Sequence, residues 1–172
     1  MSALIFIATR FIAVPYFNGI GYFNLGDCLI LFTSILIGPI EGIFSGIIGS
    51  VISDLTSGFS YFIPFTIFAK ALEALVCYLL FYLLKKYKYI KYISFFIGPL
   101  FMVLIYFIAY YLLGGVTYAL TSSSFDLLQG VIASILSIIL LELFKNFNIP
   151  GTNKNLIMFY KKNENKKDKT NV

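Results

Sequence analysis

The sequence of 172 residues contains no histidine, no tryptophan and few charged side chains. Without histidine, a histidine-based catalytic triad, a histidine metal site and a histidine proton relay are excluded. Without tryptophan, any interfacial aromatic belt must come from the 13 tyrosines and 19 phenylalanines. Charged residues make up 12% of the chain, about half the share found in soluble globular domains. These deficits argue against a soluble enzyme, a nucleic-acid-binding protein and a disordered chain.

Cysteine is also scarce. The two cysteines, Cys28 and Cys77, both lie inside apolar runs, which is typical of small buried side chains rather than of a disulfide or a metal pair. The acidic residues are too scattered to form a two-metal cluster. The sequence therefore predicts neither a metal site nor a cofactor.

Apolar residues are abundant instead. They make up 59% of the chain, and the mean hydropathy is +0.89. At about 20 residues per membrane crossing, residues 1–145 have room for five or six helices. We therefore predict an all-α integral membrane protein, a six-transmembrane-helix bundle over residues 1–145. Residues 146–172, rich in Asn and Lys, are predicted to form a disordered basic cytoplasmic tail.

Charges and breaks divide the apolar part into runs. The predicted spans are residues 1–17, 28–37, 40–55, 62–84, 93–113 and 125–144. The second run has about ten residues, roughly half a crossing. Either the preceding loop 18–27 dips into the protein and continues as helix, or the second and third runs form a re-entrant element. The stretch 114–124 is expected to be a loop.

Lysine positions predict the orientation of these spans. Lys85, Lys86, Lys88 and Lys91 share one loop, and Lys145 with six further lysines lies at or after the last span. The loops 18–26, 57–61 and 114–124 contain no Lys or Arg. Six spans with both termini in the cytoplasm place every basic loop residue inside. The basic tail is thus explained by orientation and by attraction to anionic membrane lipid, without nucleic acid.

A few polar residues interrupt the apolar runs, and a charge in the hydrocarbon core is a functional candidate by default. Lys70 and Glu73 are three residues apart, so they share a helix face and can partly neutralise each other. With the predicted orientation, the polar candidates gather in the outer half of the bundle, where they suit a small amphipathic ring. The candidate substrate-binding residues are Asn18, Tyr22, Asn24, Asp27, Thr66, Lys70, Glu73, Tyr106, Tyr110, Asp126 and Gln129. The alternative is that charges such as Lys70, Glu73 and Asp54 pair only to hold the bundle together.

Nothing in the sequence indicates catalysis. A serine nucleophile would lack a histidine base, and residues 46–50 (GIIGS) lack the lysine of a phosphate-binding loop. We therefore predict that the chain is not an enzyme. Uptake of a solute would need a partner, a gradient or an oligomer.

Several motifs in order resemble a known family. They are FNLGD at 23–27, Gly38-Pro39 followed by Gly42, GIIGS at 46–50 followed by Asp54 and Ser57-Gly58, and Pro64-Phe65-Thr66 followed by Lys70 and Glu73. This set resembles the substrate-binding S component of energy-coupling factor (ECF) vitamin transporters, in the branch for riboflavin, hydroxymethylpyrimidine and pyridoxine-type compounds. The resemblance is strongest over residues 8–80.

The resemblance implies a function and partners. An S component captures a vitamin or vitamin precursor at the outer membrane face and delivers it inward with a transmembrane coupling protein and two cytoplasmic ATPases. It implies that loop 18–27 is a lid and that the fourth to sixth spans line the pocket. It also implies that small residues of the first span, here Thr9 and Ala13, meet the coupling protein.

The sequence pattern is compatible with more than one vitamin. The many polar candidates and the absence of tryptophan favour a small ring such as hydroxymethylpyrimidine or a pyridoxine-like compound over riboflavin. The competing hypothesis is a structural or small channel-like membrane protein that binds no vitamin.

Overall fold

The computed structural model describes residues 1–11, 14–16, 21–23, 25–87 and 89–144. Its α-helices are α1 (Ser2–Phe11), α2 (Gly26–Leu36), α3 (Pro39–Ser57), α4 (Ile63–Leu84) and α5 (Ile93–Phe144). Short 3-10 turns, η2 (Ser60–Phe62) and η3 (Ile90–Tyr92), precede α4 and α5. Two short strands, β1 (Val14–Tyr16) and β2 (Gly21–Phe23), lie between α1 and α2.

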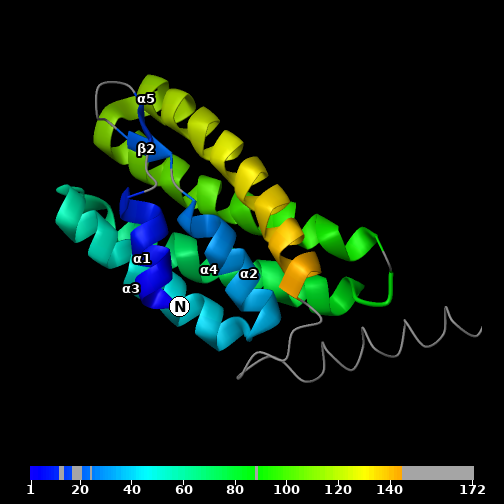
Figure 1. Ribbon diagram of the computed structural model, residues 1–172. Helices are drawn as coiled ribbons and strands as arrows, with labels where there is room; N and C mark the ends of the chain where they lie inside the picture. Colours follow the sequence, from blue (N-terminus) through cyan, green and yellow to red (C-terminus); the bar gives the residue numbers. More distant parts are fainter. Residues whose placement is uncertain (12–13, 17–20, 24, 88, 145–172) are drawn as a thin grey trace, which may run out of the picture.

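The long helix α5 reverses direction at Gly115. This glycine has φ 78° and ψ −174°, a backbone conformation that side chains with a Cβ rarely adopt. The two halves of α5 then run back side by side (Figure 1), and the hydroxyl of Ser134 donates to the carbonyl of Phe95 over 2.6 Å. With this division, the described residues contain six α-helical segments.

The prediction of a loop over residues 114–124 is therefore wrong. Helix resumes directly after Gly115, although the segment is rich in serine and threonine. The hydroxyls of Thr121 and Ser124 donate to the carbonyls of Thr117 and Leu120, each over 2.8 Å. Because these hydroxyls bond within their own helix, they do not need water and do not break the helix.

The first apolar run, 1–17, is not one helix. Helix α1 ends at Phe11, and β1 pairs antiparallel with β2, with Pro15 opposite Tyr22. Proline is tolerated in such an edge strand, because its missing N–H is not needed there. The predicted loop 18–27 thus contains a strand, and α2 begins at Gly26.

Helix α3 carries small residues on its inner face, among them Gly42, Gly46 and Gly49. A Cβ on Gly42 would lie 2.7 Å from Cα of Ser34 in α2, and one on Gly49 would lie 2.7 Å from Ile5 in α1. These backbones approach as closely as the glycines allow, which is how helices pack in lipid. The outer face of α3 instead exposes large apolar side chains: Ile40, Phe44, Ile48, Ile52 and Leu55.

An apolar exterior around polar buried residues is the reverse of a soluble protein. Two helical stretches, Ser60–Leu84 and Ile90–Phe144, are long and apolar enough to cross a membrane. Helices α1 and α2 are apolar but shorter. The chain is thus an all-α integral membrane protein.

The bundle has two distinct ends (Figure 1). The C-terminal end of α1, the β1–β2 hairpin and the Gly115 turn gather at one end. The C-terminal ends of α2, α4 and α5 gather at the other. The hairpin and the Gly115 turn, in stretches without Lys or Arg, thus share one end, and the lysine-rich connection between α4 and α5 lies at the opposite one.

Candidate functional site

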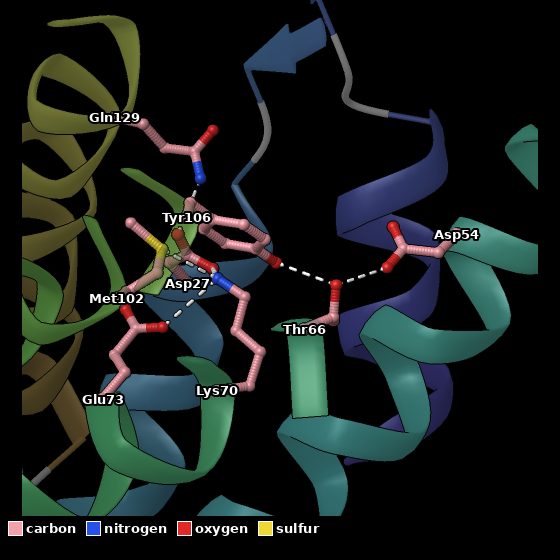
Figure 2. Close-up of polar contacts among 8 residues, drawn as sticks. All are labelled: Asp27, Asp54, Thr66, Lys70, Glu73, Met102, Tyr106 and Gln129. Carbon is pink, nitrogen blue, oxygen red and sulfur yellow. Dashed lines mark hydrogen bonds and ion pairs between the residues drawn. The ribbon is translucent and has the colours of Figure 1, made fainter. Parts of the chain in front are cut away.

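A buried lysine lies at the centre of the polar residues (Figure 2). Lys70, on α4, is 3% exposed, and its Nζ donates to a carboxylate oxygen of Asp27 and, over 3.2 Å, to Oε2 of Glu73. The Lys70 Nζ also lies 3.0 Å from the sulfur of Met102. The predicted pairing of Lys70 with Glu73 is present, one turn along the same helix. A single ammonium group is therefore held between two carboxylates.

Asp27 joins this cluster to a third helix. It lies in the first turn of α2, where backbone N–H groups favour a carboxylate. While one oxygen accepts from Lys70, the other accepts from Nε2 of Gln129 over 2.7 Å. Asp27 thus connects α2, α4 and the second half of α5 through one side chain.

A second branch runs from the cluster toward α3 (Figure 2). The Tyr106 hydroxyl lies 3.1 Å from Oγ1 of Thr66, which donates to Oδ2 of Asp54 over 2.6 Å. The Tyr106 ring centroid lies 5.7 Å from Nζ of Lys70, within cation–π range. Asp54 therefore fixes Thr66, and Thr66 fixes the tyrosine that lies beside Lys70.

The aromatic side of the site is built from stacked tyrosines. The Tyr106 and Tyr110 rings are 6.1 Å apart with an interplanar angle of 24°. Tyr110 hydrogen-bonds Asp126, which lies in electrostatic range of Lys70 and Asp27. Tyr110 and Asp126 thus extend the cluster toward the Gly115 end of α5.

Two buried carboxylate oxygens have no hydrogen-bond partner among the described residues. They are Oε1 of Glu73 and Oδ2 of Asp126, on side chains that are 0% and 6% exposed. An unpaired buried acceptor is costly, on the order of 1–3 kcal/mol. Both atoms are therefore available to a donor that is not part of the described chain.

The structure brings most of the predicted site residues together. The cluster and its branch contain Asp27, Thr66, Lys70, Glu73, Tyr106 and Gln129, and Tyr110 with Asp126 adjoins them. Tyr22 lies in β2, opposite Pro15. Asn18 and Asn24 lie outside the described residues.

Sequence reasoning missed Met102 and left Asp54 as a possible structural partner. Met102 is a fully buried apolar residue in an apolar run, so no signal in the sequence marks it as a neighbour of Lys70. Asp54 and Thr66 are 12 residues apart in different helices, and their contact depends on how α3 turns into α4.

Of the two predicted docking residues, Thr9 and Ala13, the structure describes only Thr9. Thr9 is 3% exposed, so its side chain faces the inside of the bundle in this conformation. The exposed large apolar side chains of α1 are Leu4, Ile7 and Phe11. Ala13 lies outside the described residues, and the docking face remains a prediction.

No group of three or more Cys, Asp or Glu side chains that could hold a metal ion occurs within residues 1–11, 25–87 and 89–144. The site is instead made of one ammonium, carboxylates, amide, hydroxyl and phenol groups. Such groups hydrogen-bond the edges of an organic ring while tyrosines contact its faces.

A polar cluster enclosed by apolar helices defines a membrane protein with a candidate small-solute site. The sequence model of the ECF-type riboflavin transporter S component matches residues 1–146, so the chain belongs to this family. The resemblance seen in the sequence is thereby confirmed.

A curated relative matches part of the chain. A Pyrococcus woesei protein described as "Uncharacterized protein in gap 3'region" is 31% identical over 70 residues, which is 41% of this chain and 47% of the relative. The chain thus spans about half the length of the curated relative it matches. No solved structure matches the chain.

The Thr66 branch leads to a testable prediction. Thr66→Val keeps the shape of the side chain but removes the hydroxyl between Asp54 and Tyr106, so we expect affinity for a solute at this site to fall about three- to tenfold. Titration of the purified protein with the solute measures this affinity. Thr56→Val is the matched control, because Thr56 is exposed on α3 and bonds only to its own helix. Equal affinities in the two variants would contradict a role for this branch in holding Tyr106.

Proposed function

We propose that the chain captures riboflavin at the outer membrane face and passes it inward with an ECF coupling protein and two cytoplasmic ATPases. The family description, which names riboflavin, supports the ligand. The observation that carries the proposal is the buried cluster of Asp27, Lys70, Glu73 and Gln129, placed beside two stacked tyrosines. A charged cluster of this kind is expensive inside a membrane protein, and this cost makes it a candidate for binding or transport.

The chemistry of riboflavin suits these groups. Its flat ring system can stack on tyrosine, and one ring edge alternates carbonyl acceptors with an N–H donor. The unpaired oxygens of Glu73 and Asp126 can accept from N–H and hydroxyl groups, and the Tyr106 and Tyr110 rings can contact the ring faces. Hydroxymethylpyrimidine and pyridoxine-like compounds offer the same kinds of groups on a smaller ring and are the alternatives to test.

The partners and the orientation form part of the proposal. The sequence contains no phosphate-binding loop, which favours ATPase subunits over a site in this chain as the source of energy. We propose six membrane crossings with both termini in the cytoplasm, supported by the β1–β2 hairpin and the Gly115 turn at one end of the bundle and the lysine-rich connection between α4 and α5 at the other.

Fluorescence titration tests the ligand. Purified protein in detergent is expected to quench riboflavin emission, and the absence of tryptophan leaves only tyrosine emission from the protein itself. A thermal-shift panel runs in parallel with riboflavin, hydroxymethylpyrimidine, thiamine, pyridoxine, pyridoxamine, niacin, pantothenate, biotin and folate. A ligand at 100 times its dissociation constant adds about 2.7 kcal/mol of stability. If another vitamin raises the unfolding midpoint and riboflavin does not, that vitamin is the ligand. If no vitamin raises the midpoint of the folded protein, the structural alternative is favoured.

The proposed orientation predicts which side each connection faces. Ser60→Cys, in the exposed turn before α4, is expected to react with a membrane-impermeant maleimide in intact cells. Lys86→Cys is expected to react only after the membrane is permeabilised. The natural cysteines Cys28 and Cys77 are buried, so background labelling should be low. The reverse labelling pattern would contradict the orientation.

A further inference from the structure

The polar cluster has more acceptors than donors. Lys70 is the only ammonium group in it, whereas Asp27, Glu73 and Asp126 each bring a carboxyl group. Asp54, at the end of the Thr66 branch, brings another. These four acidic side chains are all at least nine-tenths buried, so water screens their charges poorly.

The donors in the cluster are already used. The Lys70 ammonium contacts Asp27, Glu73 and the Met102 sulfur, and Gln129 donates to the second oxygen of Asp27. Asp27 is therefore satisfied on both oxygens. The unpaired atoms are acceptors, Oε1 of Glu73 and Oδ2 of Asp126. A molecule that completes this cluster must bring donors.

We propose that Glu73 and Asp126 determine specificity: they accept hydrogen bonds from a neutral, donor-bearing vitamin and reject its phosphate ester. This inference rests on the proposed function and adds the charge class of the substrate to it. The two side chains lie on different elements, α4 and the second half of α5, so the ligand bridges both.

Phosphate is rejected for an electrostatic reason. A phosphate ester carries about −1.5 to −2 charge near pH 7 and adds acceptors rather than donors. Its oxygens would compete for Lys70, which already balances two carboxylates, and would face the unpaired oxygens of Glu73 and Asp126. Hydroxyl and N–H groups of the unphosphorylated vitamin meet the same oxygens favourably. The cluster therefore separates a free vitamin from the phosphorylated form used as a coenzyme.

Riboflavin and flavin mononucleotide test this directly, because they differ only in the terminal phosphate. The full chain in detergent is titrated with each, by quenching of flavin fluorescence, in the wild type, Glu73→Gln and Asp126→Asn. We expect the wild type to bind riboflavin at least about tenfold more tightly. Each variant should bind riboflavin more weakly and reduce this preference about three- to tenfold. Glu41→Gln, which neutralises an exposed carboxylate on α3, should leave both affinities unchanged.

The outcomes separate the inference from the proposed function. Equal binding of the two flavins by the wild type, or an unchanged preference in both variants, overturns the inference while riboflavin binding stands. If riboflavin does not bind but another vitamin does, the same comparison with that vitamin and its phosphate ester decides the inference. If no vitamin binds to folded protein, the proposed function fails and the inference fails with it.

Discussion

Replacing Lys70 with methionine is expected to weaken vitamin binding at least about 30-fold. Methionine keeps much of the length and apolar stem of lysine but removes the only ammonium group between Asp27 and Glu73. Removing one partner of a buried charge pair at a binding site costs about 2–5 kcal/mol, and 2 kcal/mol corresponds to about 30-fold in affinity. Flavin titration of detergent-solubilised protein measures the effect.

This variant leaves two buried carboxylates without their cation, so its folding must be measured as well. The double variant Asp27→Asn/Lys70→Met removes the pair jointly and is expected to retain more of the wild-type thermal stability. Lys86→Met is the control, because Lys86 is exposed beyond α4. Wild-type affinity in a folded double variant would make Lys70 a structural partner of Asp27 rather than part of a binding site.

Gly42→Ala is expected to destabilise the protein by about 1–3 kcal/mol, typical of overpacking. The added Cβ would lie 2.7 Å from both Cα and Cβ of Ser34. Ser34 cannot move aside easily, because its hydroxyl donates to the carbonyl of Ala74 over 2.7 Å and so ties α2 to α4. The measurement is the thermal unfolding midpoint in detergent, with a fall of several degrees expected.

Ile48→Phe is the control for this prediction. It adds a volume similar to that added by Gly42→Ala to the same helix, but on the exposed face of α3. Its unfolding midpoint should match that of the wild type. If Gly42→Ala is as stable as Ile48→Phe, the close approach of α2 and α3 is not what holds these helices together.

The fold was predictable where apolar runs are bounded by strong signals. The predicted span 62–84 nearly coincides with α4, because Pro64 favours a helix start and the lysines after Leu84 favour its end. The error at 114–124 has a physical cause. A run of Ser and Thr is typical of a hydrated loop, but here the hydroxyls of Thr121 and Ser124 bond the carbonyl one turn back and leave the helix intact.

Most residues of the candidate site were predictable from the sequence, but most of the contacts between them were not. Spacing on one helix predicts the Lys70–Glu73 contact, because three residues are almost one turn. Asp27 precedes Lys70 by 43 residues and Gln129 by 102, so no local rule pairs them. Their contacts follow from how α2, α4 and α5 pack, which depends on many glycine and serine contacts at once.

The position of Asp27 also has a consequence for how the chain is made. During synthesis, α2 leaves the ribosome before α4, so Asp27 reaches the membrane 43 residues ahead of the lysine that neutralises it. A charged residue in the hydrocarbon core costs about 2.5–3.5 kcal/mol on insertion scales. Gln129, which binds the other oxygen of Asp27, emerges 102 residues after Asp27. The nascent chain thus contains a short, poorly anchored second helix until its later partners arrive, and membrane assembly of this helix depends on chain segments not yet translated.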